Sequence, residues 1–171
     1  GRDRATRSMA ADAGTVDLNA VVSSTTGAIA ITGNIVTQDA NITTGGMGTV
    51  NVTADVGDIT MASGTTTTTA TGNITYMADD NVALSLLTST SGNIGVTADT
   101  AAIQDNLVGE TDNLVTSGTA TLSGATGIGS ADNINTTIGT LVATNSTSGN
   151  IRIEESSGLI IGGTGVRTLA A

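Results

Sequence analysis

A short phrase recurs along the chain and limits the folds that it can adopt. It reads TGNITYMAD from Thr71 to Asp79, SGNIGVTAD from Ser91 to Asp99 and SGNIRIEE from Ser148 to Glu155. Each copy has a small residue, a glycine, a small polar residue and then a β-branched residue. Glycine permits the sharp or left-handed backbone of a tight corner, and Ile, Val and Thr favour a pleated strand. We therefore interpret each copy as a corner that leads into a short strand.

Apolar residues alternate with small polar residues after each corner. Successive side chains of a strand point to opposite faces, so this alternation predicts one apolar face and one polar face. The first inward residues that we expect in five of these strands are Ile29, Val50, Ile74, Ile94 and Ile151.

The corners recur at intervals of about 20 residues, which is typical of solenoids and propellers. The equivalent glycines are Gly27, Gly48, Gly72, Gly92 and Gly118. A second strand is expected inside most intervals, at Ile35, Ile59, Val82 and Ile103. A propeller blade needs antiparallel hairpins, which often contain Asn-Gly or Asp-Gly turns, and neither dipeptide occurs. The spacing therefore predicts an all-β protein, a parallel β-solenoid of about 7 to 8 irregular coils and about 35 Å in length.

The expected domain organisation is simple. Residues 1–13 lack the pattern and are expected to form an N-terminal tail or cap, and residues 14–171 are expected to form a single β-solenoid domain. Segments 63–72 and 104–113 are the places where we expect loops to bulge between coils. Within the first of these, the run from Thr65 to Thr69 fits either an extended strand or an exposed loop.

The composition removes most catalytic chemistry. The chain has no histidine and no cysteine, so a Ser-His-Asp triad, a cysteine nucleophile and the usual zinc or haem ligand sets cannot be built. We therefore expect no enzyme and no cofactor. Calcium needs oxygen ligands alone, which leaves Asp79, Asp80 and Asn81 as a calcium candidate, with a plain polar corner as the alternative.

The charge distribution bears on partners. A net charge of −10 repels nucleic acid and anionic membranes, and the apolar runs are shorter than the roughly 18 to 20 residues of a membrane span. We expect neither nucleic-acid binding nor membrane insertion. Three of the five basic residues, Arg2, Arg4 and Arg7, lie at one end. They are the residues that we predict to bind the acidic body of a neighbouring copy.

Two residue types allow a structural or a functional interpretation. Asn73 begins an Asn-Ile-Thr glycosylation signal, and Asn41 and Asn51 begin similar ones. The favoured interpretation is that asparagines at corners hydrogen-bond the backbone and stack into ladders between coils. Tyr76, the single aromatic residue, is expected to pack against the protein rather than serve as a ligand platform.

Several longer phrases resemble a known family. GNITYMADDNVAL, GNIGVTADTAAIQD and the stretch from Ala120 to Gly163 resemble repeats of very large bacterial exoproteins of the filamentous haemagglutinin-like type. The resemblance extends from about Gly14 to Gly165. It implies a right-handed parallel β-helix, secretion to the cell surface or the extracellular space, and a surface-fibre or adhesive role. It implies no catalytic residue.

These observations together predict a structural or adhesive β-solenoid segment of an extracellular bacterial surface fibre. Open solenoid ends expose unpaired strands, so the segment is expected to continue along its axis as a long β-helix or as a self-assembling filament. The expected partners are head-to-tail copies or flanking repeats, together with cell-surface glycans. The alternative is a carbohydrate-binding or carbohydrate-cleaving β-helix domain, which a groove lined by three or more carboxylates from successive coils would favour.

Overall fold

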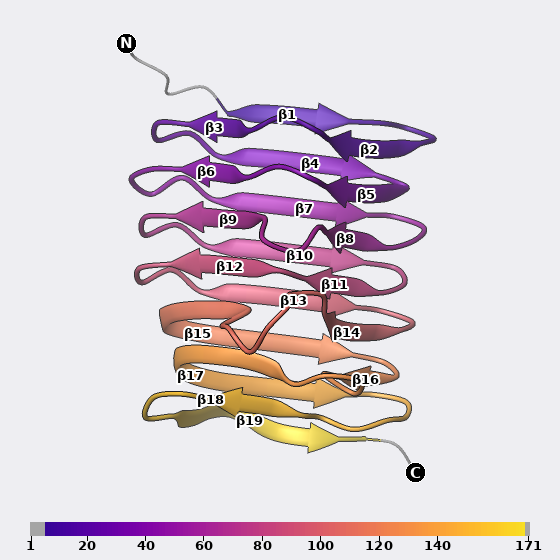
Figure 1. Cartoon of the computed structure of the whole chain (residues 1–171), viewed down its shortest axis with the longest axis vertical. Helices are drawn as coiled ribbons and strands as arrows, with labels where there is room; N and C mark the ends of the chain where they lie inside the picture. Colours follow the sequence, from indigo (N-terminus) through magenta and orange to yellow (C-terminus); the bar gives the residue numbers. More distant parts are fainter. Residues whose placement is uncertain (1–5, 170–171) are drawn as a thin grey trace.

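The strands of this chain wind into a single stack of coils. The computed structural model describes residues 6–169, in which the regular structure is entirely β-strand. The coils make about eight turns, and each coil pairs in parallel with the next (Figure 1). The predicted parallel β-solenoid is therefore confirmed. Residues 6–169 contain no helix that is long and apolar enough to cross a membrane.

Each coil passes through three walls, which we name by their strands. The long wall contains β1 (Arg7–Ala10), β4 (Ile29–Gly33), β7 (Val50–Ala54), β10 (Ile74–Ala78), β13 (Ile94–Ala98), the second halves of β15 (Leu114–Gly124) and β17 (Ile134–Asn145), and β19 (Ile160–Thr168). The short wall contains β2 (Thr15–Leu18), β5 (Ile35–Gln38), β8 (Ile59–Met61), β11 (Val82–Leu84), β14 (Ala102–Asp105) and β16 (Gly127–Ile128). The hydroxyl wall contains β3 (Val22–Ser24), β6 (Ile42–Thr44), β9 (Thr66–Thr69), β12 (Leu86–Ser89), the first halves of β15 and β17, and β18 (Ile153–Glu155).

Strands β15 and β17 are long because they run through a corner without interruption. Each begins in the hydroxyl wall and ends in the long wall, so these two walls form one 13-stranded sheet, whereas the short wall is a separate 6-stranded sheet. The pairing of β15 with β17 shifts register between Thr116 and Thr119, where the chain turns this corner. Such an irregularity bends a strand without ending it.

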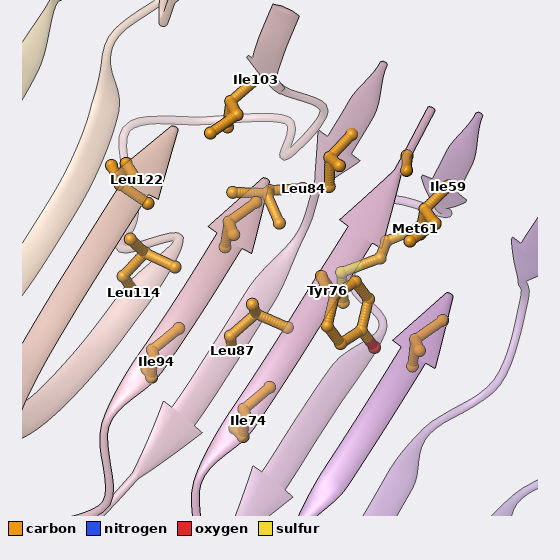
Figure 2. Close-up of a cluster of buried hydrophobic side chains, with 14 of the residues drawn as sticks. Ile59, Met61, Ile74, Tyr76, Leu84, Leu87, Ile94, Ile103, Leu114 and Leu122 are labelled. Carbon is orange, nitrogen blue, oxygen red and sulfur yellow. The ribbon is translucent and has the colours of Figure 1, made fainter. Parts of the chain in front are cut away.

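The core lies between the three walls and consists of columns of stacked aliphatic residues (Figure 2). One column in the long wall runs from Ile29 through Val50, Ile74 and Ile94, all of which are fully buried. These four inward assignments are confirmed, and the fifth, Ile151, is partly buried and packs against the same core. The alternation of apolar and polar residues therefore set the inward face as expected.

The second strands expected at Ile35, Ile59, Val82 and Ile103 are present in the short wall. Their inward column runs through Val36, Ile59, Val82 and Ile103. Ile35 lies on the outer surface and is 42% exposed. Two β-branched residues are adjacent here, so the alternation alone could not determine which one faces the core.

The corner glycines are needed for a different reason from the one that the sequence suggested. Gly48, Gly72 and Gly92 do not have positive φ angles, so a left-handed backbone is not their role. A Cβ atom on Gly72 would overlap the carbonyl oxygen of Gly48, and one on Gly92 would overlap that of Gly72. The glycines therefore allow successive coils to approach closely at this corner.

A column of buried hydroxyl groups completes the same corner. Ser89 Oγ accepts a hydrogen bond from the amide of Gly92 and donates to the carbonyl oxygen of Gly72, at 2.9 and 3.1 Å. Thr116 Oγ1 donates to the carbonyl oxygen of Gly92 at 2.6 Å. Buried backbone groups need such partners. The glycine corner therefore requires a serine or threonine close by in each coil.

Asparagines form a ladder on the outside of this corner, as predicted. Asn73 Oδ1 accepts a hydrogen bond from the amide of Asn93 at 2.8 Å, and Asn93 Oδ1 accepts one from the amide of Thr119 at 3.0 Å. Asn41 Oδ1 similarly accepts a hydrogen bond from the amide of Thr66. Each of these side chains bonds to the next coil instead of to its own backbone.

The two predicted bulges have different outcomes. Residues 66–69 form strand β9, so the extended alternative for the threonine run is confirmed and the prediction of a loop there is wrong. Thr67 and Thr69 can point inward because their hydroxyl groups have hydrogen-bond partners. Thr67 bonds with the distant Gln38 and with Tyr76, and Thr69 donates to the carbonyl oxygen of Gly72 at the following corner. Residues 106–112 do form a loop between β14 and β15, as expected (Figure 1). We call residues 106–112 the acidic loop.

The described part of the N-terminal segment belongs to the solenoid. Strand β1 pairs in parallel with β4 over four residues and forms the first strand of the long wall. Residues 1–5 of the expected tail or cap lie outside the described residues.

Candidate functional site

A groove crosses the hydroxyl wall over several coils. Its volume is about 500 Å³, and none of the residues that line it is charged. Its polar lining comes mainly from the hydroxyl groups of Thr68, Thr88, Thr90, Ser117, Thr137 and Ser157.

The strand register builds this groove from distant parts of the sequence. Thr68 pairs with Thr88, Thr88 with Val115, and Val115 with Thr137. All four occupy outward positions of the hydroxyl wall, at the spacing of about 4.8 Å between paired strands. The result is a row of hydroxyl groups with one valine in it.

The hydroxyl groups of the groove differ in their availability. Ser117 Oγ donates to the carbonyl oxygen of Thr90 at 2.8 Å, and Thr137 Oγ1 donates to Asp112 Oδ2 at 2.7 Å. Thr68 and Thr88 have no side-chain hydrogen bond to any residue between 6 and 169. A hydroxyl group both donates and accepts hydrogen bonds, so Thr68 and Thr88 offer both kinds of group at the surface of the groove.

A buried polar cluster supports the wall beneath the groove. Tyr76 Oη donates to Gln38 Oε1 at 2.5 Å and lies 2.7 Å from Thr67 Oγ1. The three residues come from the long, short and hydroxyl walls respectively, so the cluster joins all three inside the core (Figure 2 shows Tyr76 pointing inward). Burial raises the pKa of the Tyr76 phenol, and the hydrogen bond with Thr67 lowers it by less. Tyr76 is a packed residue, as predicted.

A second, smaller site lies where the acidic loop returns to the solenoid. We call it the acidic recess; its volume is about 80 Å³, and it is lined by Glu110, Asp112, Asn135, Glu154 and Ser156. Asn135 Nδ2 donates to Glu110 Oε2 at 3.4 Å. The Asn135 side chain is 6% exposed, and its Oδ1 atom has no hydrogen-bond partner. Within residues 6–169, Asn145 Oδ1 is the other buried side-chain oxygen without a partner.

The predicted calcium candidate lies elsewhere, at a corner between the long and short walls. Asp80 Oδ1 accepts a hydrogen bond from Thr100 Oγ1 at 2.9 Å. Asn81 donates from its amide and from Nδ2 to Asp58 Oδ1, and its own Oδ1 accepts from the amide of Ala102. The side chains of Asp80 and Asn81 thus join successive coils. In the described chain, no three carboxylate side chains are placed to hold a metal ion.

The two ends of the core differ in character. At the N-terminal end a hollow of about 830 Å³ opens beside β1, with Arg7 and Met9 among its lining residues. Arg7 is exposed and stacks on Ile29 at the head of the inward column, whereas Arg2 and Arg4 lie outside the described residues. At the C-terminal end the inward columns terminate at Ile161 and Val166, which are 54% and 44% exposed.

Sequence reasoning did not find the groove or the recess. The hydroxyl-bearing runs TTTT at Thr66–Thr69 and TST at Thr88–Thr90 were a signal for the groove. Glu110 and Asp112 were visible as acids in an expected loop, but nothing local indicated that the loop folds back toward Asn135 and Glu154.

Comparisons with known proteins leave the family open. No family model, no curated protein and no solved structure matches this chain. The resemblance to filamentous haemagglutinin-like repeats therefore depends on the quoted phrases alone.

Proposed function

We propose that this chain is a structural or adhesive β-solenoid segment of an extracellular bacterial surface fibre and that its coils continue along the axis. The continuation is either a flanking part of a longer β-helix or another copy in a filament. The observation that carries the proposal is the C-terminal end of the core, where the inward columns terminate at the exposed Ile161 and Val166.

The apolar end surface favours another coil as its partner. Inward residues of the middle coils are fully buried because coils lie on both sides of them, whereas β19 pairs with β17 alone within the described chain. Exposed apolar patches and unpaired strand edges are both features that bind other chains. A further coil in the same register would cover Ile161 and Val166 and pair the free edge of β19.

The charges near the ends are compatible with head-to-tail contact. Arg7 lies in the first coil, and Glu154 and Glu155 lie in β18 of the last. Arg2 and Arg4 are close to Arg7 in the sequence. Arg152 and Arg167 also lie near the C-terminal end, so both ends carry charges of both signs. Contacts in which each copy presents its N-terminal end to the C-terminal end of the next generate open filaments.

The hydroxyl groove favours the adhesive part of the proposal. Thr68 and Thr88 present hydroxyl groups that are available to an uncharged ligand, and cell-surface glycans have this chemistry. Carbohydrate binding as the main function is therefore the second candidate. For cleavage, the groove lacks the carboxylate lining that would favour it, and the acidic recess is too small for a sugar ring.

The axial proposal is tested by comparing assembly before and after a charge is placed at the C-terminal end. Wild-type chain at near-physiological salt is expected to form rods longer than one chain, seen by electron microscopy and light scattering. Ile161→Asp should abolish them, because an unpaired carboxylate would be buried in the joint. Met47→Asp, at a turn where Met47 is 85% exposed, is the matched control and should assemble normally.

A different result would contradict the proposal. If purified chain and native material both consist of monodisperse rods one chain long, with no axial neighbour, the coils do not continue. Long rods in native material alone would support the flanking-repeat form over self-assembly.

A further inference from the structure

A pocket lies beneath the acidic loop, beside the hydroxyl groove. Its volume is about 270 Å³, and its apolar lining comes from Leu86, Leu107 and Val115, each of which is half-buried. Leu107 belongs to the acidic loop, whereas Leu86 and Val115 belong to strands β12 and β15 of the hydroxyl wall. The pocket is therefore enclosed by the wall on one side and by the loop on the other, and we call it the loop pocket.

Hydrogen bonds to a distant coil hold the acidic loop in this position. Asn106 Nδ2 donates to the carbonyl oxygen of Met61 at 2.7 Å, and the amide of Val108 donates to Ser63 Oγ at 3.0 Å. Both partners lie two coils before the loop, because β8 pairs with β11 and β11 pairs with β14. Leu107 lies between these two anchored residues, so the loop pocket is formed before any ligand binds, as most small-molecule sites are.

The loop pocket and the hydroxyl groove are neighbouring parts of one surface. Val115 lines both of them. Leu86 of the pocket and Thr88 of the groove are outward residues of β12, two positions and hence about 7 Å apart along the strand. Thr137 of the groove donates a hydrogen bond to Asp112 of the pocket at 2.7 Å. One ligand can therefore place an apolar group in the pocket and hydroxyl groups along the row.

The loop pocket combines its apolar lining with a hydrogen-bond acceptor. Asp112 Oδ2 accepts the bond from Thr137, whereas Asp112 Oδ1 has no hydrogen-bond partner within residues 6–169. Ligand pockets typically pair apolar walls with a few polar groups that fix orientation. A methyl group next to an N–H donor matches this pairing, and the acetamido group of an N-acetylated sugar has both.

The charge of the chain limits the sugars that fit. Within residues 6–169, no basic residue lines the groove or the loop pocket. The five basic residues of the chain all lie before residue 8 or after residue 151, and the net charge is −10. Sulfated and carboxylated glycans are therefore repelled from this surface. The expected ligand is an uncharged glycan.

We propose that the hydroxyl groove and the loop pocket form one binding site for uncharged oligosaccharides that carry N-acetyl groups. The acetyl methyl group packs among the apolar residues of the pocket, and the amide N–H donates to Asp112 Oδ1. The sugar hydroxyl groups bond with Thr68 and Thr88, so the oligosaccharide extends across coils. This inference rests on the adhesive part of the proposed function and adds the class of glycan.

Two trisaccharides test the site. Triacetylchitotriose and cellotriose differ only in the group beside each anomeric carbon, which is acetamido in the first and hydroxyl in the second. NMR titration of wild-type chain should show saturable binding of triacetylchitotriose with a Kd on the order of 1 mM, with shifts of the Leu86, Leu107 and Val115 methyl signals. Cellotriose should bind at least about fivefold more weakly, because it leaves the loop pocket empty.

Val115→Thr is the first variant, because it keeps the shape of the side chain and replaces one methyl group with a hydroxyl group. It should weaken triacetylchitotriose binding about fourfold and change cellotriose binding less than about twofold. Leu107→Ala should weaken triacetylchitotriose binding about fivefold or more. The matched control is Val142→Thr, the same change at a half-buried outward position of β17 in the long wall, which should leave both affinities unchanged.

The proposal is overturned if wild-type chain binds neither trisaccharide up to about 20 mM, or binds the two equally. Equal weakening by Val115→Thr and Val142→Thr would also overturn it, because the sugar would then have no preference for the hydroxyl wall. The axial form of the proposed function does not depend on these outcomes, since rods and their loss in Ile161→Asp are measured without sugar.

Discussion

Ile94 and Ile161 occupy the same inward column of the long wall, yet their environments are opposite. The column continues from Ile94 through Ala120 and Leu141 to Ile161. Ile94 is fully buried and Ile161 is 54% exposed. Both follow the same alternating pattern, so the pattern determines the direction of a side chain, whereas coils on both sides determine its burial. In a solenoid each coil is stabilised by its neighbours, and an end coil has one neighbour fewer.

The largest expected effect comes from placing an aspartate at Ile94, with the same substitution at Ile161 as the comparison. Ile94→Asp should lower the free energy of unfolding by about 4 kcal/mol or more, because it buries an unpaired carboxylate. Ile161→Asp should cost less than about 1 kcal/mol in the unassembled chain, because its carboxylate remains in water. Urea unfolding followed by circular dichroism measures both. An Ile94→Asp protein as stable as the wild type would contradict the core assignment.

The next test compares Gly72 at the glycine corner with Gly95 in β13, because the space around the two glycines differs. Gly72→Ala should destabilise the fold by about 1–3 kcal/mol, since its Cβ would overlap the carbonyl oxygen of Gly48. Gly95→Ala, on the open face of β13 with no atom within 4 Å of the new Cβ, should be neutral or stabilising by up to about 1 kcal/mol. Thermal unfolding of the two variants gives the comparison. If both changes were neutral, close stacking would not explain the corner glycines.

The buried polar cluster allows a subtler test of the middle coils. Tyr76→Phe should cost about 1–3 kcal/mol, because Gln38 Oε1 and Thr67 Oγ1 lose a partner inside the core. Replacing all three together, as Tyr76→Phe with Gln38→Met and Thr67→Val, should restore part of the loss, because no buried polar group then remains unpaired. A triple variant less stable than the single one would show that packing, not hydrogen bonding, dominates at this site.

The smallest effect is expected at the last coil, where Glu155 organises the turn after β18. Burial raises the pKa of Glu155, but hydrogen bonds from Ser157, Thr136 and the amide of Ile138 lower it by more, so the net shift is downward. A lowered folded-state pKa means that the stabilisation is present above the ordinary value of 4.5 and is lost as the pH falls through the folded-state value. The Glu155 carboxyl signal in an NMR titration should therefore show a midpoint below 4.5. A midpoint at or above 4.5 would show that these hydrogen bonds do not stabilise the charged Glu155 carboxylate.

Much of the fold could be predicted because its signals are local. The glycine corner, the β-branched strand after it and the period of two lie within about ten residues of one another. The one error lies at the loop expected in residues 63–72, because Thr66–Thr69 contains no apolar residue to mark it as a strand. The adjacent Ile35 and Val36 likewise give no local signal for which of them faces the core. Thr67 faces inward because Gln38 and Tyr76, distant in sequence, satisfy its hydroxyl group.

By itself the sequence determined the β-solenoid, the approximate number of coils and most of the inward column, because alternation and corner spacing are properties of one coil. The tertiary structure alone decided the hydroxyl groove and the acidic recess. Thr68, Thr88 and Thr137 form a row only after register aligns four coils, and Glu110 meets Asn135 only after the acidic loop folds back. Surface sites in a solenoid extend across coils, perpendicular to the strands, so each combines residues that are separated by a full coil of sequence.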